Sequence, residues 1–151
     1  MFDSSIPKPE TVMRVEKTVL LQADPSAVWN ALTDPKLTSK YFFGCEAISD
    51  WQVGSPLHYQ TVEDGQATVH VTGVIRAIEP NRYLECTCVP VGTEGMLGRE
   101  TVITYTLTEG PDGTTLRVNQ GEFEDDEIRV QNDACDLILA GLKQLVEVPA
   151  G

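Results

Sequence analysis

The sequence predicts an α+β protein in which a curved antiparallel sheet of about six or seven strands wraps around one long C-terminal helix. Three observations predict this architecture. An alternating N-terminal segment is followed by two Asp-Pro pairs ten residues apart. Alternating apolar segments separated by short turns then occupy the middle of the chain, and a long helical pattern rich in apolar residues closes it.

The first predicted strand covers residues 13–22. Its odd-numbered residues from Met13 to Leu21 are apolar, with Lys17 as the exception, and their neighbours are mostly polar. Such alternation is typical of a strand with one buried face.

Two short helices are expected between residues 23 and 42, because each begins with an Asp-Pro pair. At Asp24-Pro25 and Asp34-Pro35 the aspartate suits the capping position and the proline suits the first helical position. Helices of two or three turns are marginal on their own, so these two must pack against the rest of the protein.

The middle of the chain predicts a meander, since consecutive alternating segments are joined by short turns and therefore pair antiparallel. Gly73 lies inside one of these segments, which predicts a bend or a close approach by another element. The Gly-Pro-Asp-Gly sequence at 110–113 is typical of a hairpin turn. The expected strands cover residues 45–49, 57–62, 67–79, 82–89, 100–109 and 114–121.

The C-terminal segment, residues 123–148, predicts a helix of about 20 residues and about 30 Å. Its acidic first turn suits the positive end of the helix dipole. Apolar or small residues cover more than half of its circumference, which predicts a deeply buried helix. They are Val130, Ala134, Leu137, Ile138, Gly141, Leu142 and Leu145.

Length and charge limit the classes of function. The 151 residues favour one domain, 1–151, with residues 1–12 as a loose arm. The net charge of −12 disfavours nucleic acid and anionic membrane surfaces as partners. No segment approaches the ~18 apolar residues of a membrane span, and no secretion signal is visible. We therefore expect a cytoplasmic protein with reduced cysteines.

Motifs for catalysis or metal binding are absent from the sequence. His58 and His70 lie opposite the apolar residues of their strands, and no Ser-His-Asp string, HExxH or P-loop occurs. Cys86 and Cys88 lack the second cysteine pair of a structural zinc site. The acidic residues at 122–127 lack the ligand spacing of a calcium loop. We therefore expect no cofactor and no metal.

Four motifs carry a resemblance to a known family. They are Val28-Trp29-x-Ala31-Leu32-Thr33-Asp34-Pro35, Gly54-Ser55-Pro56-Leu57, Gly73-Val74-x-x-x-Ile78-x-Pro80 and Gly113-Thr114-x-Leu116. In this order they resemble the START-like or SRPBCC superfamily, which has the helix-grip fold. Within it, the chain is similar to bacterial relatives of the activator of heat-shock protein 90 ATPase. Two departures stand out: Ala134-Cys135 replaces the usual Gly-Trp pair, and Tyr41-Phe42 replaces the usual Trp-Phe.

The resemblance implies a cavity for a small apolar molecule between the sheet and the C-terminal helix. Strand parity directs one set of residues toward that interior: Leu57, Tyr59, Val71, Ile75, Cys86, Cys88, Ile103, Tyr105 and Val118. From the helix we add Leu137, Ile138 and Gly141. Near the mouth we expect Trp29, Tyr41, Phe42, Trp51 and Met96. The same residues would also serve an ordinary filled core, and Trp29 in particular would serve as a packing anchor.

The expected function is non-catalytic binding of a small apolar or aromatic molecule in the cytoplasm. Two alternatives stay open. The resemblance also suits a chaperone-associated binding module with a role in the stress response, and superfamily members include cyclase, aromatase and hydrolase enzymes on aromatic or polyketide-like substrates. A homodimer through an exposed strand edge or through residues 96–97 is a further expectation.

Overall fold

The computed structural model describes residues 13–92, 95–96 and 100–147. The sheet consists of β1 (Met13–Leu21), β2 (Glu46–Ser49), β3 (Pro56–Glu63), β4 (Gln66–Glu79), β5 (Tyr83–Gly92), β6 (Gly95–Met96), β7 (Thr101–Gly110) and β8 (Gly113–Phe123). The helices are α1 (Pro25–Thr33), α2 (Pro35–Thr38) and α3 (Asp125–Val146). The strands pair antiparallel in the order β1-β8-β7-β5-β4-β3-β2, and β6 pairs with β5. The predicted fold class is confirmed.

The two short helices begin at the prolines, as predicted. The Asp34 carboxylate accepts a hydrogen bond of 2.9 Å from the backbone N–H of Lys36 and so caps α2. Asp24 makes no side-chain cap on α1, and only its backbone carbonyl accepts the first helical hydrogen bonds. Burial of Val28, Trp29 and their neighbours against the core holds α1 in place instead.

Two glycines of the family motifs lie where another strand comes so close that a larger side chain would clash with its backbone. A Cβ atom at Gly73 would lie 1.8 Å from the carbonyl oxygen of Thr87, so β4 and β5 approach closely there, as predicted. A Cβ atom at Gly113 would lie 2.1 Å from the carbonyl oxygen of Leu21. Beside it, the buried Thr114 hydroxyl donates a hydrogen bond of 2.7 Å to the Ala23 carbonyl, which ties the start of β8 to the end of β1.

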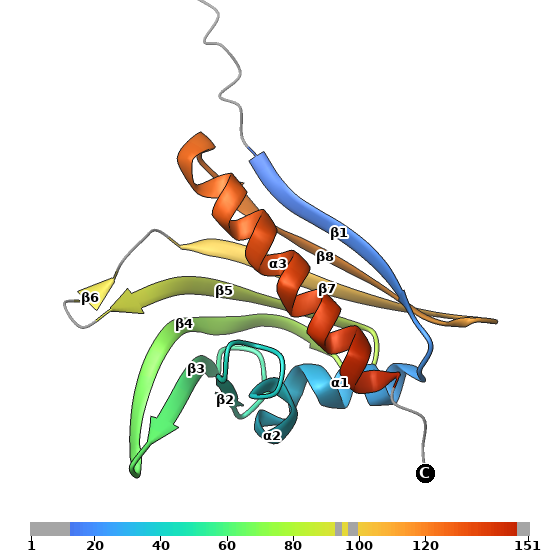
Figure 1. The fold of residues 1–151 in the computed structure, drawn as a ribbon, viewed down its shortest axis with the longest axis horizontal. Coiled ribbons are helices and arrows are strands. Elements are labelled where there is room, and N and C mark those ends of the chain that lie inside the picture. Colours follow the sequence, from blue (N-terminus) through green and yellow to red (C-terminus); the bar gives the residue numbers. More distant parts are fainter. Residues whose placement is uncertain (1–12, 93–94, 97–99, 148–151) are drawn as a thin grey trace, which may run out of the picture.

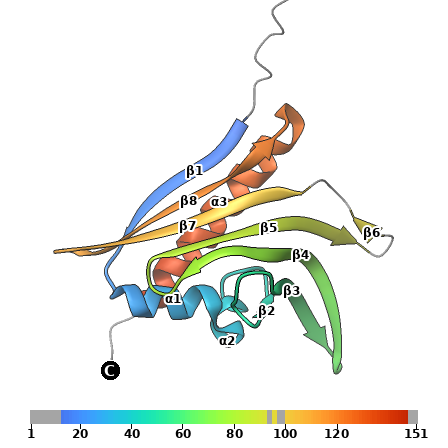
Figure 2. The same cartoon turned by 180° about the vertical axis from the view of Figure 1, so that it is seen from behind.

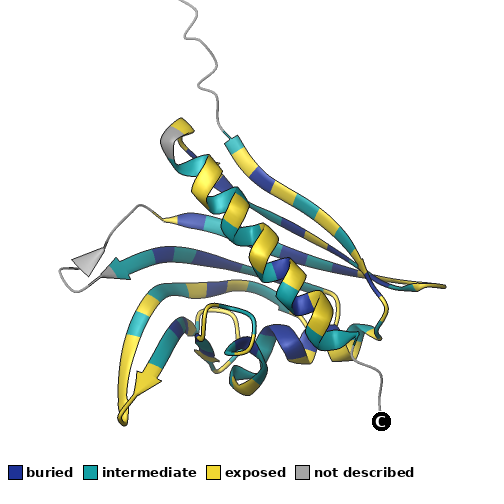
Figure 3. Cartoon of the chain, in the orientation of Figure 1, coloured by how far each residue is buried: buried dark blue, intermediate teal, exposed yellow. Residues whose placement is uncertain are grey.

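Helix α3 lies diagonally across one face of the curved sheet, and the view from behind shows the sheet covering only that side of it (Figures 1 and 2). The outward face of α3 is exposed along its length (Figure 3). Val130 and Leu137 are 64% and 63% exposed, while Leu139 and Leu142 are buried. The expectations of a deeply buried helix and of an inward Leu137 are therefore wrong, because the sheet curls over one side of the helix alone.

Lys17, the polar exception in β1, reaches α3. Its ammonium group lies 3.0 Å from the carboxylate of Asp136. Farther along α3, Lys143 pairs with Glu147 at 2.7 Å, and Glu147 accepts a hydrogen bond from the backbone N–H of Gln22. Polar contacts thus attach the helix to β1 along its length. No helix in the described part of the chain combines the length and the hydropathy that a membrane span requires.

Candidate ligand cavity

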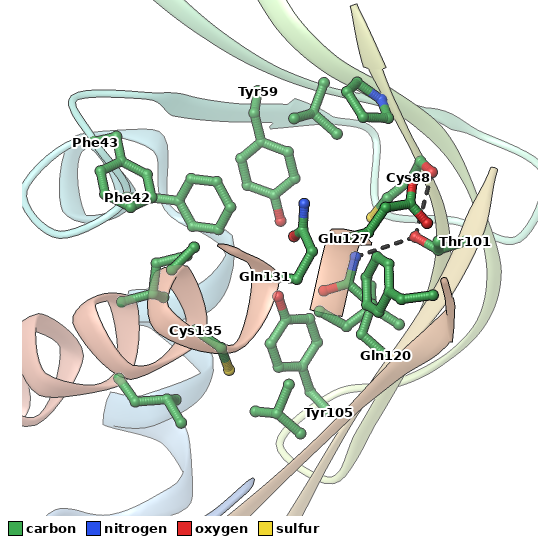
Figure 4. A pocket seen from close by; sticks show the side chains of 18 residues that line it. Phe42, Phe43, Tyr59, Cys88, Thr101, Tyr105, Gln120, Glu127, Gln131 and Cys135 are labelled. Carbon is green, nitrogen blue, oxygen red and sulfur yellow. Dashed lines mark hydrogen bonds between the residues drawn. The ribbon is translucent and has the colours of Figure 1, made fainter. Parts of the chain in front are cut away.

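A cavity of about 250 Å³ lies between the concave face of the sheet and the N-terminal half of α3 (Figure 4). Most of its lining is apolar, with tyrosine, threonine, glutamine and glutamate side chains among it. The lining residues are Phe42, Phe43, Tyr59, Val71, Cys88, Pro90, Thr101, Ile103, Tyr105, Val118, Gln120, Phe123, Glu127, Gln131, Ala134, Cys135, Ile138 and Leu139.

The periods of strand and helix explain how these residues meet. On β7, alternate residues 101, 103 and 105 face the cavity, as side chains two apart share one face of a strand. On α3, residues 127, 131, 134, 135 and 138 are spaced by three or four, which is the spacing of one helical face. The cavity is therefore enclosed by one face of the sheet and one face of the helix.

Two consecutive phenylalanines border the cavity beside α2. The ring of Phe42 stacks on the ring of Tyr59, with centroids 4.4 Å apart and 15° between the planes. The next residue, Phe43, adopts a left-handed backbone conformation with φ of 53° and is 59% exposed. Phe42 therefore orients the Tyr59 ring, while Phe43 lines the cavity where it meets solvent.

Two buried tyrosines face each other in the cavity. Figure 4 shows the hydroxyls of Tyr59, on β3, and Tyr105, on β7, pointing toward its centre. Burial raises the pKa of Tyr59 well above its usual value, and a hydrogen bond from Tyr105 acts in the opposite direction. Burial, together with the nearby Tyr59, also raises the pKa of Tyr105. Both hydroxyls therefore stay protonated at neutral pH.

The cysteines around the cavity are free thiols. A hydrogen bond with Cys88, followed by burial, raises the pKa of Cys86 well above its usual value. Burial also raises the pKa of Cys135, although the nearby Lys17 acts against it. A raised pKa keeps a thiol protonated and unreactive.

A polar group lies at the end of the cavity nearest the start of α3. The Gln120 amide donates a hydrogen bond of 3.1 Å to the Thr101 hydroxyl, which donates one of 3.5 Å to the carbonyl of Cys88. Glu127 accepts a hydrogen bond of 2.9 Å from the backbone N–H of Glu124, which belongs to the cap of α3. These polar side chains thus have hydrogen-bond roles within the fold.

Eight of the residues expected at a cavity line this one: Phe42, Tyr59, Val71, Cys88, Ile103, Tyr105, Val118 and Ile138. Leu57, Ile75, Cys86 and Trp29 are buried in the core and do not line it. The side chain of Met96 lies outside the described residues. Of the two expectations for Trp29, the packing anchor holds and the place near the mouth does not, because α1 packs this side chain among core residues.

Three residues that were expected at the cavity pack within the fold instead: Tyr41, Gly141 and Trp51. The Tyr41 hydroxyl donates a hydrogen bond of 2.6 Å to the carbonyl of Ala31. A Cβ atom at Gly141 would lie 2.8 Å from the Cβ of Tyr41, so the two elements are in direct contact. Trp51 packs half-buried against the core in the turn before β3. None of the three lines the cavity.

Several lining residues were missed because they are polar or small. Gln131 continues the helical spacing that starts at Glu127 and ends at Ile138, and that spacing was a usable signal. Ala134 and Cys135, which were singled out as a departure from the family pattern, lie on the same helical face and line the cavity. Thr101 and Gln120 share strand faces with apolar residues that were selected. Phe43 and Pro90 have no such signal, because they follow an irregular turn and a strand end.

The histidines lie on the other side of the sheet from the cavity residues of their strands. His58 and Thr72 share a hydrogen bond of 3.0 Å, and His70 and Thr61 share one of 2.8 Å. Within the described ranges, no group of three or more histidine, cysteine, aspartate or glutamate side chains is arranged to hold a metal ion.

The curved sheet, the long helix across it and the cavity between them define a START-like protein of the SRPBCC superfamily, with the helix-grip fold. Residues 22–147 match the family described as Activator of Hsp90 ATPase homolog 1-like protein, and the chain belongs to that family. The predicted resemblance is confirmed. A comparison with curated proteins finds no match.

Solved structures support the same fold. Protein MLL2253 from Mesorhizobium loti is 25% identical, with a TM-score of 0.72 over 89% of this chain and 97% of that one. The Aha1 dimer from Colwellia psychrerythraea is 18% identical, with a TM-score of 0.70 over 92% and 99% of the two chains. DynU16, from the dynemicin biosynthetic locus, is 22% identical with a TM-score of 0.74; the match covers 89% of this chain and 47% of DynU16.

Proposed function

We propose that the protein binds a small, largely apolar molecule in the cavity between the sheet and α3, without catalysing its conversion. The observation that carries this proposal is the cavity itself: about 250 Å³ of space whose lining is mostly apolar. Pockets for small molecules are commonly apolar with a few polar groups that orient the ligand. Apolar cavities of about 150 Å³ hold one benzene ring, so this cavity suits a ligand of about ten non-hydrogen atoms.

A non-catalytic role is supported by the state of the groups in the cavity. The raised pKa values of Tyr59 and Tyr105 make these hydroxyls hydrogen-bond donors rather than bases at neutral pH. Glu127 caps the N-terminus of α3 through its backbone contact with Glu124. These groups suit binding and orientation of a ligand.

The test is a screen of aromatic, fatty and terpenoid compounds by thermal shift, with mass spectrometry of what co-purifies. A ligand of the native fold raises the melting temperature by mass action. The matched variants are Ala134→Phe, which fills the cavity, and Ala140→Phe, on the exposed side of the same helix. We expect the shift to vanish in Ala134→Phe and to persist in Ala140→Phe. Equal shifts in both variants, or no ligand at all, would contradict the proposal.

A cytoplasmic location, self-association and chaperone association also stay proposals. Family membership supports an association with a chaperone, and the dimeric Colwellia relative supports a homodimer. Light scattering on the purified chain measures its mass in solution, and a pull-down with a purified Hsp90 measures the association. A monomer that does not retain the chaperone would contradict both proposals.

A further inference from the structure

We propose that the ligand is a neutral molecule whose main polar feature is an acceptor oxygen, such as a ketone carbonyl, and that the hydroxyls of Tyr59 and Tyr105 bind this oxygen. The inference rests on the proposed function and names the chemistry of the ligand at that same cavity.

The curvature of the sheet brings these two tyrosines together. Their strands, β3 and β7, are separated in the sheet by β4 and β5. The pairing of β3 with β4 shifts register between Tyr59 and Gln60, and such irregularities commonly re-aim a side chain. The stacked ring of Phe42 then holds the Tyr59 ring in its orientation. The two hydroxyls consequently point toward the same space (Figure 4).

The other two tyrosines of the chain donate to acceptors within the protein. The Tyr41 hydroxyl donates to the carbonyl of Ala31, and the Tyr83 hydroxyl donates to Glu85 at 2.7 Å. Tyr59 and Tyr105 instead interact with each other. Both of their hydroxyls point into the cavity (Figure 4). Because buried tyrosine hydroxyls ordinarily bond to an acceptor, an oxygen of the ligand at this place can accept hydrogen bonds from them.

The charges around the cavity favour a neutral ligand. Its described lining includes no lysine, arginine or histidine, and the one carboxylate is Glu127. A carboxylate ligand would lose its hydration without gaining an opposite charge, which is strongly unfavourable. The formal net charge of −12 adds long-range repulsion of an anion. A neutral oxygen has neither the desolvation penalty nor the repulsion of a carboxylate. Both tyrosines remain protonated and can donate to it.

The experiment uses three probes of one shape: isobutylbenzene, phenylacetone and phenylacetate. They carry a methyl group, a carbonyl oxygen or a carboxylate oxygen at the same position, and each has about ten non-hydrogen atoms, to suit the cavity. Their dissociation constants are measured by NMR titration on the full chain. The native protein is compared with Tyr59→Phe and Tyr105→Phe, and with Tyr83→Phe as the control outside the cavity.

The decisive quantity is the affinity for phenylacetone relative to isobutylbenzene, because this ratio cancels general effects of a substitution on the cavity. We expect it to fall about 3–10-fold in Tyr59→Phe or Tyr105→Phe, the range for one hydrogen bond, and to be unchanged in Tyr83→Phe. The carbonyl stretch of bound phenylacetone should also return toward its value in apolar solvent in the variants. Phenylacetate should bind at least about 100-fold more weakly than phenylacetone.

The outcomes separate this inference from the proposed function. If isobutylbenzene and phenylacetone bind and the ratio is the same in all four proteins, the proposed function stands and the tyrosine assignment is wrong. Phenylacetate binding as tightly as phenylacetone overturns the requirement for a neutral ligand. Failure of all three probes, and of the wider screen, overturns the proposed function itself. Retained binding of isobutylbenzene shows that a variant still folds.

Discussion

The two halves of α3 face the same sheet, yet one half is packed and the other borders a cavity. Around the C-terminal half, Leu142 is completely buried, α1 contacts the helix, and Tyr41 packs directly against Gly141. Around the N-terminal half, about 250 Å³ stays open beside Ala134 and Cys135. The difference arises because α1 and the segment after α2 insert large side chains at one end, while α3 presents small ones at the other.

This contrast indicates that the two ends have different roles. A filled end supplies buried apolar area and close packing, which stabilise the fold. A partly empty end forgoes some of that stabilisation and leaves room for a ligand. The four predictions below test this division, beginning with substitutions in α3.

The loss of stability on truncating a leucine of α3 should depend on which face of the helix the leucine occupies. We expect Leu142→Ala to lower the free energy of unfolding by about 2–5 kcal/mol, because it leaves a void in the packed end. Leu137→Ala, at an exposed position of the same helix, should change it by no more than about 0.5 kcal/mol. Denaturant unfolding followed by circular dichroism gives both values. Similar losses in the two variants would contradict the contrast.

Enlarging a side chain should harm the packed end and spare the cavity. Gly141→Ala places a Cβ atom 2.8 Å from that of Tyr41, and we expect a loss of about 1–3 kcal/mol from overpacking, despite the better helix propensity of alanine. Ala134→Leu extends into open space and should leave stability unchanged or raise it by up to about 2 kcal/mol. The same denaturation assay tests both variants. A greater loss of stability in Ala134→Leu than in Gly141→Ala would contradict the assignment of the packed and open ends.

Alkaline pH should destabilise the protein through its buried tyrosines. The pKa values of Tyr41, Tyr59, Tyr83 and Tyr105 are raised in the folded state, chiefly by burial, above the value of about 10 in the unfolded chain. The unfolded chain then loses protons that the folded state retains. The contribution of the tyrosines to stability is therefore complete below about pH 10 and is lost as pH rises toward the folded pKa values, by up to about 1.4 kcal/mol per pH unit for each tyrosine.

Unfolding measured from neutral to alkaline pH, with tyrosinate absorbance as a second readout, checks this dependence. The double variant Tyr59→Phe/Tyr105→Phe should lower this slope by about 2.7 kcal/mol per pH unit, which is the part of the two cavity tyrosines, and should keep the part that Tyr41 and Tyr83 contribute. A slope unaffected by the double variant would mean that the cavity tyrosines ionise as freely as in the unfolded chain.

Removing single hydroxyls should give the smallest difference. Tyr41→Phe deletes the hydrogen bond to the carbonyl of Ala31, and we expect a loss of about 1 kcal/mol. Tyr59→Phe removes a hydroxyl that faces the cavity and should cost the free protein less. Thermal unfolding of the two variants measures the difference, and a larger loss in Tyr59→Phe would count against an open cavity.

Local sequence rules predicted most of the fold. Asp34-Pro35 determined where α2 begins, alternation determined the strands, and Gly73 marked a close approach that the structure contains. Each of these depends on steric and hydrogen-bonding preferences within a few residues. Six of the eight correctly expected lining residues followed from strand parity, since side chains two apart on a strand share a face.

Which end of α3 is packed was decided only in the tertiary structure. The sequence shows apolar or small residues around more than half of this helix, and it does not reveal that Leu137 faces solvent while Leu139 and Leu142 face the core. The meeting of Tyr59 and Tyr105 depends on how far the sheet curves over four strands. Curvature and the position of empty space result from the summed volumes of side chains that are distant in sequence, so no local pattern encodes them.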